Sequence, residues 1–353
     1  MNNGSGRPPA RHPPSGRPSQ PSVADPSDDN TSDNDEDTHS DASADLCELA
    51  DEDFPASFVT RDGRLFHSHG RLPYPLPADG REQKRLEAQN LVLKDVMGSI
   101  CPDMRLVREV LASGTGRALD LCTGTGQWVK DMAVMFPQVK VIGIDIVPIQ
   151  TRYPPGRAQF EIADITEGLR HESNSFDLVH ARCTAFSVTE QRYPIMLRDV
   201  ARVLRPGGLF ISGEFRNYPV FPERRPGRND PDILCPHFFR FLGLTAQALG
   251  LLGVRWDLSC KIPQWLEASG SFYNITRRTF ELPIGDWHPE QRHSGIKAAE
   301  IFVGFVEAME SFLGYSGLIP KEELARLMGG AIYELQHVSG LVMYYDVVCA
   351  HKR

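Results

Sequence analysis

The sequence predicts an α/β fold built around a doubly wound, mainly parallel sheet. Three observations lead to this expectation. Short apolar runs alternate with segments of helical periodicity between residues 117 and 215. A glycine-rich turn at residues 123–126 follows the first of these runs, and a Pro-Gly-Gly turn at residues 206–208 leads into the last. Such alternation is typical of a parallel sheet with helices on both faces.

Residues 1–53 are expected to form a disordered tail that is proline-rich first and acidic afterwards. Three arginines against 13 acids give the tail a net charge of -10, and the total of -8 leaves +2 for residues 54–353. Few apolar residues and a high charge allow too little burial to offset the cost of ordering the chain. Because residues 54–353 are nearly neutral, we do not expect nucleic acid as a partner. The tail could still bind a protein partner.

Cysteine usage and hydropathy indicate a protein inside the cell. The seven cysteines are widely spaced and form no CxxC pair, which fits a reducing compartment and gives no sign of a metal site. No apolar run reaches the roughly 18 residues needed to span a bilayer, and the N-terminus lacks the apolar core of a signal peptide. We therefore expect a cytoplasmic protein with no membrane partner, and a nuclear location stays open.

Residues 54–115 are expected to form an N-terminal lid followed by helices. An extended run at residues 64–68 precedes three closely spaced prolines, and helices are expected from near Asp79 and over residues 104–112. Tyr74 lies in the proline-stiffened segment. Its ring could fold over a bound ligand, or it could simply pack against the sheet.

Residues 116–215 are expected to form the ligand-binding core. One helix is predicted to follow the glycine-rich turn and to end at residue 136, and a second helix is predicted at residues 194–204. Strands are predicted at residues 118–121, 139–146, 159–164, 175–182 and 209–215. Ligands of doubly wound sheets bind at the carboxyl ends of the strands. The polar residues that fall at or near such ends are Asp120, Asp145, Asp164 and His180.

The glycine-rich turn and its acids indicate a nucleoside that carries a positive charge. Gly124 and Gly126 allow the backbone to approach a ligand closely. Asp145 closes the next strand, where its carboxylate can accept hydrogen bonds from two ribose hydroxyls. The Asp-x-Cys-x-Gly-x-Gly pattern of residues 120–126 differs from the dinucleotide fingerprint, and an early acid suits a cationic ligand better than a pyrophosphate. The pattern therefore points to S-adenosylmethionine.

A second acid follows the third predicted strand. Asp164 lies where a strand end can hydrogen-bond an adenine amino group, and the neighbouring Ile165 can pack on the ring. The alternative is a carboxylate in a loop that contacts no ligand.

Residues 216–353 are expected to form a substrate cap and the closing strands of the sheet. Helices are predicted at residues 238–252, 263–268, 296–312 and 320–335, and strands at residues 272–282 and 341–349. The apolar helix at residues 238–252 would roof an acceptor pocket, since such pockets are mostly apolar. Ile301 and Phe305 are expected to belong to the core instead of contacting the cofactor.

The sequence resembles the fungal LaeA-like (UMTA-type) class I methyltransferases over about residues 60–353. This group includes regulators of secondary metabolism and enzymes encoded in metabolite gene clusters. Five segments carry the likeness: YPLP at residues 74–77 with residues 79–86, DLCTGTGQW at 120–128, VIGIDIVPIQ at 141–150, FDLVHAR at 176–182 and LPIGDW at 282–287. The resemblance implies a Rossmann-like sheet of seven strands with a helical cap insertion.

The resemblance also implies S-adenosyl-L-methionine as the cofactor, with the segment around Tyr74 as a lid. The residues expected to bind it are Tyr74, Asp120, Cys122, Gly124, Gly126, Asp145, Ile146, Asp164 and Ile165. The chain departs from the family at two positions. Cys122 stands where the family usually has glycine, and Ala163 replaces an acid that often precedes Asp164.

A methyltransferase acting on a small molecule of fungal secondary metabolism is the expected function. A sulfonium methyl group is already activated, so positioning can supply most of the rate. If the acceptor is a hydroxyl, a base adds about 100-fold or more. His180 is the candidate for this catalytic role, and a structural hydrogen bond is the alternative for its ring. The other functional hypothesis is a LaeA-like nuclear regulator that acts through protein partners or protein methylation.

Overall fold

The computed structural model of this chain describes residues 48–70, 72–112, 114–222 and 230–353. Most of the expected tail, and part of the loop after residue 222, lie outside the described residues. Residues Asp45–Arg353 form one compact unit, and all of the elements below belong to it. Within the described ranges, no helix is both long and apolar enough to cross a membrane.

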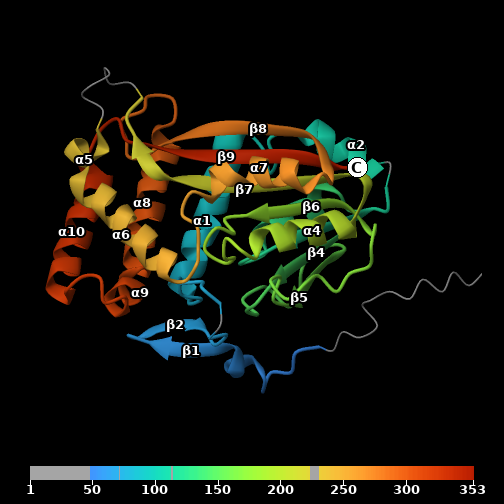
Figure 1. Ribbon diagram of the computed structural model, residues 1–353, viewed down its shortest axis with the longest axis horizontal. Helices are drawn as coiled ribbons and strands as arrows, with labels where there is room; N and C mark the ends of the chain where they lie inside the picture. Colours follow the sequence, from blue (N-terminus) through green and yellow to red (C-terminus); the bar gives the residue numbers. More distant parts are fainter. Residues whose placement is uncertain (1–47, 71, 113, 223–229) are drawn as a thin grey trace, which may run out of the picture. The chain divides into compact units, whose positions relative to one another are not determined.

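A seven-stranded mixed sheet forms the centre of this unit, with the strand order β5-β4-β3-β6-β7-β9-β8 (Figure 1). The strands are β3 (Arg117–Leu121), β4 (Lys140–Asp145), β5 (Ala158–Ile162), β6 (Phe176–Arg182), β7 (Leu204–Val220), β8 (Phe272–Pro283) and β9 (Val342–Lys352). The first five pair in parallel, whereas β9 runs antiparallel to both of its neighbours. The expected doubly wound sheet of seven strands is confirmed.

Helices cover both faces of the sheet because neighbouring residues of a strand point to opposite sides. On one face lie α1 (Gly80–Met97), α2 (Met104–Ala112) and α3 (Gln127–Met135), which share a buried core with Val141 and Leu178. On the other face lie α4 (Tyr193–Val203) and α7 (Leu258–Ser269), which share a core with Ile142 and Val179.

A helical cap forms a third core at one end of the long strands β7, β8 and β9 (Figure 1). Its helices are α5 (Pro231–Leu234), α6 (Pro236–Leu251), α8 (Arg292–Ala308), α9 (Glu310–Tyr315) and α10 (Lys321–His337). The predicted helix at residues 296–312 is thus two helices, because the chain turns at Met309. The predicted helix at residues 263–268 begins earlier, at Leu258, and contains Pro263.

A hairpin precedes α1; the extended run predicted at residues 64–68 is its second strand, whereas its first strand and the pairing were not predicted. It consists of β1 (Phe58–Arg61) and β2 (Arg64–His67), preceded by the short helix η2 (Phe54–Ser57). The connecting Asp62 and Gly63 have φ angles of 46° and 73°. An Asp-Gly pair with two positive φ angles is the signature of a two-residue hairpin turn.

The Pro-Gly-Gly segment lies within β7. The sequence predicted a turn that precedes the strand, and the structure corrects this prediction. The pairing with β6 shifts from Phe176 opposite Leu204 to Leu178 opposite Leu209. The extra residues, including Gly207 at a φ of 77°, are absorbed as an irregularity in the strand. Pairing with β9 also extends β7 to Val220, beyond the predicted end at residue 215.

Candidate functional site

A cavity lies where the carboxyl ends of the parallel strands meet α1 and the cap. It encloses about 1650 Å³, including the part that is open to solvent. Seven of the nine residues predicted to bind the cofactor line it: Tyr74, Cys122, Gly124, Asp145, Ile146, Asp164 and Ile165. Asp120 and Gly126 are not among the lining residues: Gly126 ends the glycine-rich turn, and Asp120 accepts a hydrogen bond from Thr123 of the turn.

The turn after β3 follows a left-handed path that explains its glycines. The φ angles of Cys122, Gly124 and Gly126 are 54°, 57° and 73°. A Cβ atom at Gly126 would come within 2.4 Å of the Phe160 ring, so this glycine is required by packing. A Cβ atom at Gly124 would meet only Leu86, at 3.6 Å. Because Gly124 lines the cavity, the missing side chain there leaves room for a ligand.

Cys122 adopts a conformation that glycine would adopt without strain. A non-glycine residue at positive φ costs on the order of 1 kcal/mol or more. Burial, together with the charge of Asp145, raises the pKa of the Cys122 thiol well above its usual range. The thiol is therefore neutral at physiological pH and presents a weakly polar surface to the cavity.

Asp145 closes β4 with its carboxylate in the wall of the cavity. The backbone N–H of Gly124 donates to Oδ2 at 2.8 Å, and the N–H of Ile146 donates to Oδ1 at 2.8 Å. Desolvation raises the pKa of Asp145 to about 6 in spite of these hydrogen bonds. The N–H of Val147 also donates to Oδ1, at 3.3 Å. Since a carboxylate has about four acceptor positions, one position on Oδ2 remains for a hydroxyl of a ligand.

Gln150 fixes the turn against the loop after β4, and this role was missed by sequence reasoning. Its Nε2 donates to the carbonyl oxygens of Gly124, at 2.6 Å, and of Val147, at 3.2 Å. The residue closes the segment VIGIDIVPIQ, so the signal was present in the sequence.

His180 and Asp120 form a buried pair inside the sheet. His180 Nδ1 lies 2.7 Å from Asp120 Oδ1, and the imidazole stacks on Trp128 with 4.2 Å between the ring centroids. Thr123 Oγ1 donates to the other oxygen of Asp120 at 2.6 Å. Burial lowers the pKa of His180, so the ring is neutral and donates its Nδ1–H to the carboxylate. His180 is not among the lining residues, so its position weighs against the predicted catalytic role.

Asp164 and Ile165 line the cavity just beyond the end of β5. The backbone N–H and the hydroxyl of Thr166 both donate to Asp164 Oδ1, at 2.8 and 2.7 Å. Ile165 is buried. Ala163 also lines the cavity, to which it presents a methyl group.

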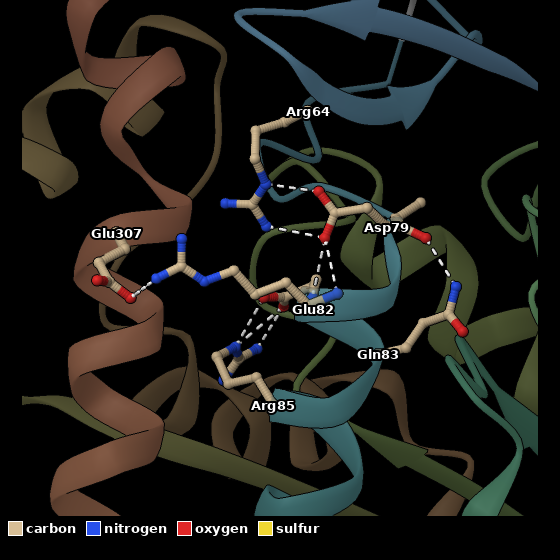
Figure 2. Close-up of polar contacts among 8 residues, drawn as sticks. Arg64, Asp79, Glu82, Gln83, Arg85 and Glu307 are labelled. Carbon is tan, nitrogen blue, oxygen red and sulfur yellow. Dashed lines mark hydrogen bonds and ion pairs between the residues drawn. The ribbon is translucent and has the colours of Figure 1, made fainter.

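The segment that carries Tyr74 is attached at several points to the hairpin. His67 Nε2 bonds to the Tyr74 carbonyl oxygen at 3.0 Å, and the Ala78 N–H donates to the carbonyl of Leu65 at 2.7 Å. The Arg64 guanidinium binds both oxygens of Asp79, the residue that caps α1 (Figure 2). The Tyr74 side chain is half-buried against the cap and faces the cavity.

An aromatic chamber forms the part of the cavity that lies beneath the cap. We define it by the lining residues Phe186, Phe215, Leu242, Ile301, Phe302, Phe305 and Met343. Phe186 stacks between Trp256 and Phe305, with centroid distances of 5.7 and 5.9 Å. Ile301 and Phe305 are buried, as expected of core residues, and they also contact the cavity. Helix α8 supplies more of the roof than the apolar helix that the sequence suggested.

Glu214 is a buried acid in the cavity wall that sequence reasoning missed. It lies in β7 and is only 2% exposed. Thr184 donates its N–H and its hydroxyl to Oε1, at 2.7 and 2.8 Å. Desolvation raises the pKa of Glu214 to about 7. An acid within an apolar strand is rare, and that was the available signal.

Polar residues of α1 complete the wall and were also missed. Arg85 donates to both oxygens of Glu82, and its Nη1 donates to Gln89 Oε1 at 3.0 Å. Asn90 Oδ1 accepts a hydrogen bond from Arg182 Nη2 at 2.9 Å. Their spacing places these polar side chains on the face of the helix that is turned toward the sheet.

Comparison with known proteins identifies a methyltransferase domain at residues 118–208. The chain is 29% identical over 227 residues to the secondary metabolism regulator laeA of Coprinopsis cinerea, covering 63% of this chain and 56% of that protein. It is 27% identical over 253 residues to the methyltransferase pytC of Aspergillus terreus, covering 71% of this chain and 73% of that protein.

The chain therefore matches little more than half of the length of the laeA regulator. Among solved structures, a phosphoethanolamine N-methyltransferase of Haemonchus contortus aligns with a TM-score of 0.40 and 15% identity, over 77% of this chain and 58% of that one. This likeness is too distant to assign any residue of the cavity a role.

Proposed function

We propose that this chain, a LaeA-like protein with a class I methyltransferase domain, transfers the methyl group of S-adenosylmethionine to a small, largely apolar acceptor. One observation carries the proposal. The cavity runs without interruption from the acids at the ends of β4 and β5 to the aromatic chamber beneath the cap. A donor and an acceptor can therefore bind side by side in one enclosed space.

The residues at one end of the cavity suit the donor. Asp145 Oδ2 has capacity for one ribose hydroxyl, and Gly124 leaves the turn open. Ile146 and Ile165 offer aliphatic surface for the adenine ring, next to the carboxylate of Asp164. The bound donor would supply a methyl group that is already activated by its sulfonium. The protein then contributes mainly by orienting the two reactants and excluding water.

The predicted division of the chain is part of the proposal. Residues 54–115 carry the lid and α1, residues 116–215 the donor site, and residues 216–353 most of the aromatic chamber. We assign His180 a positioning role, because its ring holds Asp120 while Asp120 accepts the Thr123 hydroxyl of the turn.

Calorimetric titration of the full chain with S-adenosylmethionine and then S-adenosylhomocysteine tests the donor site. We expect micromolar binding that is lost in Asp145→Ala and weakened at least tenfold in Gly124→Ala, whose new methyl group would face the cavity. Asp286→Ala, which alters an exposed acid outside the cavity, is the control. Wild-type affinity in Asp145→Ala would overturn the donor assignment.

The regulatory relatives support a second candidate, in which the acceptor is a protein. The two candidates differ in the labelled product. With tritiated S-adenosylmethionine and fractionated fungal extract, a small-molecule methyltransferase labels the low-molecular-weight fraction. Label confined to the protein fraction would favour the second candidate.

A further inference from the structure

Glu214 differs from the other acids of the cavity because of its position. It projects from β7, the strand next to β6, and lies beside the loop of residues 183–187 that follows β6. Phe215 and Asn217 of the same strand line the cavity as well. Glu214 therefore stands at the boundary between the donor end of the cavity and the aromatic chamber.

Glu214 has no cationic partner to hold its charge. Among the residues that the structure describes, no lysine, arginine or histidine forms an ion pair with it, and its hydrogen-bond donors are Thr184 and the backbone of Ala185. Buried acids that serve structure are usually paired. Asp346, which is equally buried, binds Arg216 at 2.7 Å, and Asp177 binds Arg205. An unpaired buried carboxylate at a cavity is a candidate for proton transfer.

The groups that face Glu214 from the surrounding elements are neutral. They are Cys122 after β3, Cys183 after β6, Tyr193 of α4 and Tyr345 of β9. Burial raises the pKa of each of these groups, to about 12 for Cys183 and well above the usual range for Cys122 and Tyr345. The charges of Arg182 and Arg85 lower the pKa of Cys183. Arg85 forms an ion pair with Glu82, and Arg182 donates to Asn90. Glu214 is thus the group in this cluster that can exchange a proton near neutral pH.

The aromatic chamber restricts what the acceptor can be. Its lining is made of phenylalanine, leucine, isoleucine and methionine side chains, with rings stacked along one wall. A flat, apolar body fits such a chamber. An acceptor atom next to Glu214 must in addition carry a proton that the carboxylate can remove.

We propose that Glu214 is the catalytic base of this enzyme and that the acceptor is the hydroxyl of a flat, largely apolar molecule such as a phenol. This inference rests on the proposed function. The acceptor oxygen forms a bond to the methyl carbon as the carbon–sulfur bond breaks, and the electron pair of that bond stays on sulfur as a neutral thioether. The hydroxyl proton passes to the Glu214 carboxylate, which releases it to solvent after the product leaves.

The test uses the full chain, tritiated S-adenosylmethionine and two probes, 2-naphthol and 2-naphthoate. Naphthol needs a base near neutral pH, whereas naphthoate is already ionised. We expect methylation of 2-naphthol with a kcat/KM that rises with pH and levels off above about 7, the pKa of Glu214. Glu214→Gln should lower this kcat/KM about 100-fold or more at pH 7.5, with an unchanged Kd for S-adenosylmethionine. Its remaining rate should increase about tenfold per pH unit, without the plateau, as naphthol itself ionises. Glu214→Asp should recover part of the rate.

Glu334→Gln is the matched control. Glu334 is also buried and accepts backbone N–H groups, from His237 and Phe238, but it does not line the cavity. Its substitution should leave the kcat/KM for naphthol unchanged, and thermal unfolding verifies that both variants are folded.

Three results would overturn the inference: Glu214→Gln within threefold of the wild type on naphthol, methylation of naphthoate alone, or no methylation of naphthol by a chain that binds S-adenosylmethionine. A chain that fails to bind S-adenosylmethionine would contradict the proposed function itself.

Discussion

At the scale of single residues, four acids in the described part of the chain show what distinguishes the cavity. Asp177 and Asp346 are paired with arginines and lie away from the cavity. Asp145 and Glu214 line the cavity, and within the described part of the chain neither has an ion-pair partner. Desolvation without a nearby cation raises the pKa of an acid, and both acids show this effect. The two acids of the cavity therefore differ from the other two in having no nearby cation among the described residues.

Asp145 gives the first prediction, a pH dependence of donor binding. In the proposed complex, the ionised carboxylate accepts a hydrogen bond from a ribose hydroxyl, and desolvation raises its pKa in the free protein to about 6. Affinity for S-adenosylmethionine should be constant above about pH 7 and should weaken towards tenfold per pH unit below about 6. Calorimetry between pH 5 and 8 measures this.

Asp145→Asn is expected to bind weakly at every pH in this range. Glu214→Gln should retain the pH dependence of the wild type, because Asp145 is intact. An affinity of the wild type that does not change between pH 5 and 8 would contradict the role of Asp145.

At the scale of elements, the hairpin and the start of α1 fix the segment that carries Tyr74, which we propose to be a lid. Asp79 accepts the N–H groups of Arg81 and Glu82 as the helix cap, and it also binds the Arg64 guanidinium from β2 (Figure 2). The same helix end reaches the cap, because Arg81 binds Glu307 of α8. The segment between β2 and α1, which carries Tyr74, is thus fixed at the end that leads into α1.

The substitution Arg64→Leu is therefore expected to loosen the proposed lid, although Arg64 itself does not line the cavity. Asp79 remains as the helix cap, so the free energy of unfolding should fall by only about 1 kcal/mol. The Kd for S-adenosylmethionine should rise severalfold, since the Tyr74 segment loses one of its attachments to the hairpin. Calorimetry and chemical denaturation of the same samples separate the two effects.

Arg81→Leu is the matched control, because it removes a charge and an ion pair from the same helix end. Its Kd should equal that of the wild type. An unchanged Kd in Arg64→Leu would mean that the lid does not depend on the hairpin.

At the scale of the whole molecule, the last strand joins all three cores. Met343 packs in the cap core, Val348 in the core beneath α4 and α7, and Tyr345 in the core beneath α2 and α3. β9 also lies between β7 and β8, so β8 depends on it for its place in the sheet. The last strand of the chain is therefore one of the most central.

A chain that ends at Leu341 should fail to fold cooperatively. Without β9, the edges of β7 and β8 are unpaired and each core loses buried side chains. Thermal unfolding monitored by circular dichroism should show no sharp transition. A chain that lacks only Arg353 should have a Tm within about 2 °C of the full chain. A cooperative transition in the shorter chain would show that the parallel strands form an independent domain.

Most of the fold could be predicted from the sequence because its signals are local. Apolar periodicity located the strands and helices to within a few residues, and α2 was located at its observed bounds. The errors arose where pairing overrode a local signal. β7 continues through a Pro-Gly-Gly segment because β6 and β9 pair with it on either side.

The sequence by itself determined the glycine-rich turn, the acids at the strand ends and the kind of ligand that they suit, since turn chemistry and residue spacing are local properties. Only the tertiary structure decided which side chains reach the cavity. His180 is buried away from the cavity, whereas Glu214 and the aromatic chamber line it. Tyr74 and Met343 line the same cavity although 269 positions separate them in the chain. Contacts over such separations depend on the packing of the whole chain, which no local pattern encodes.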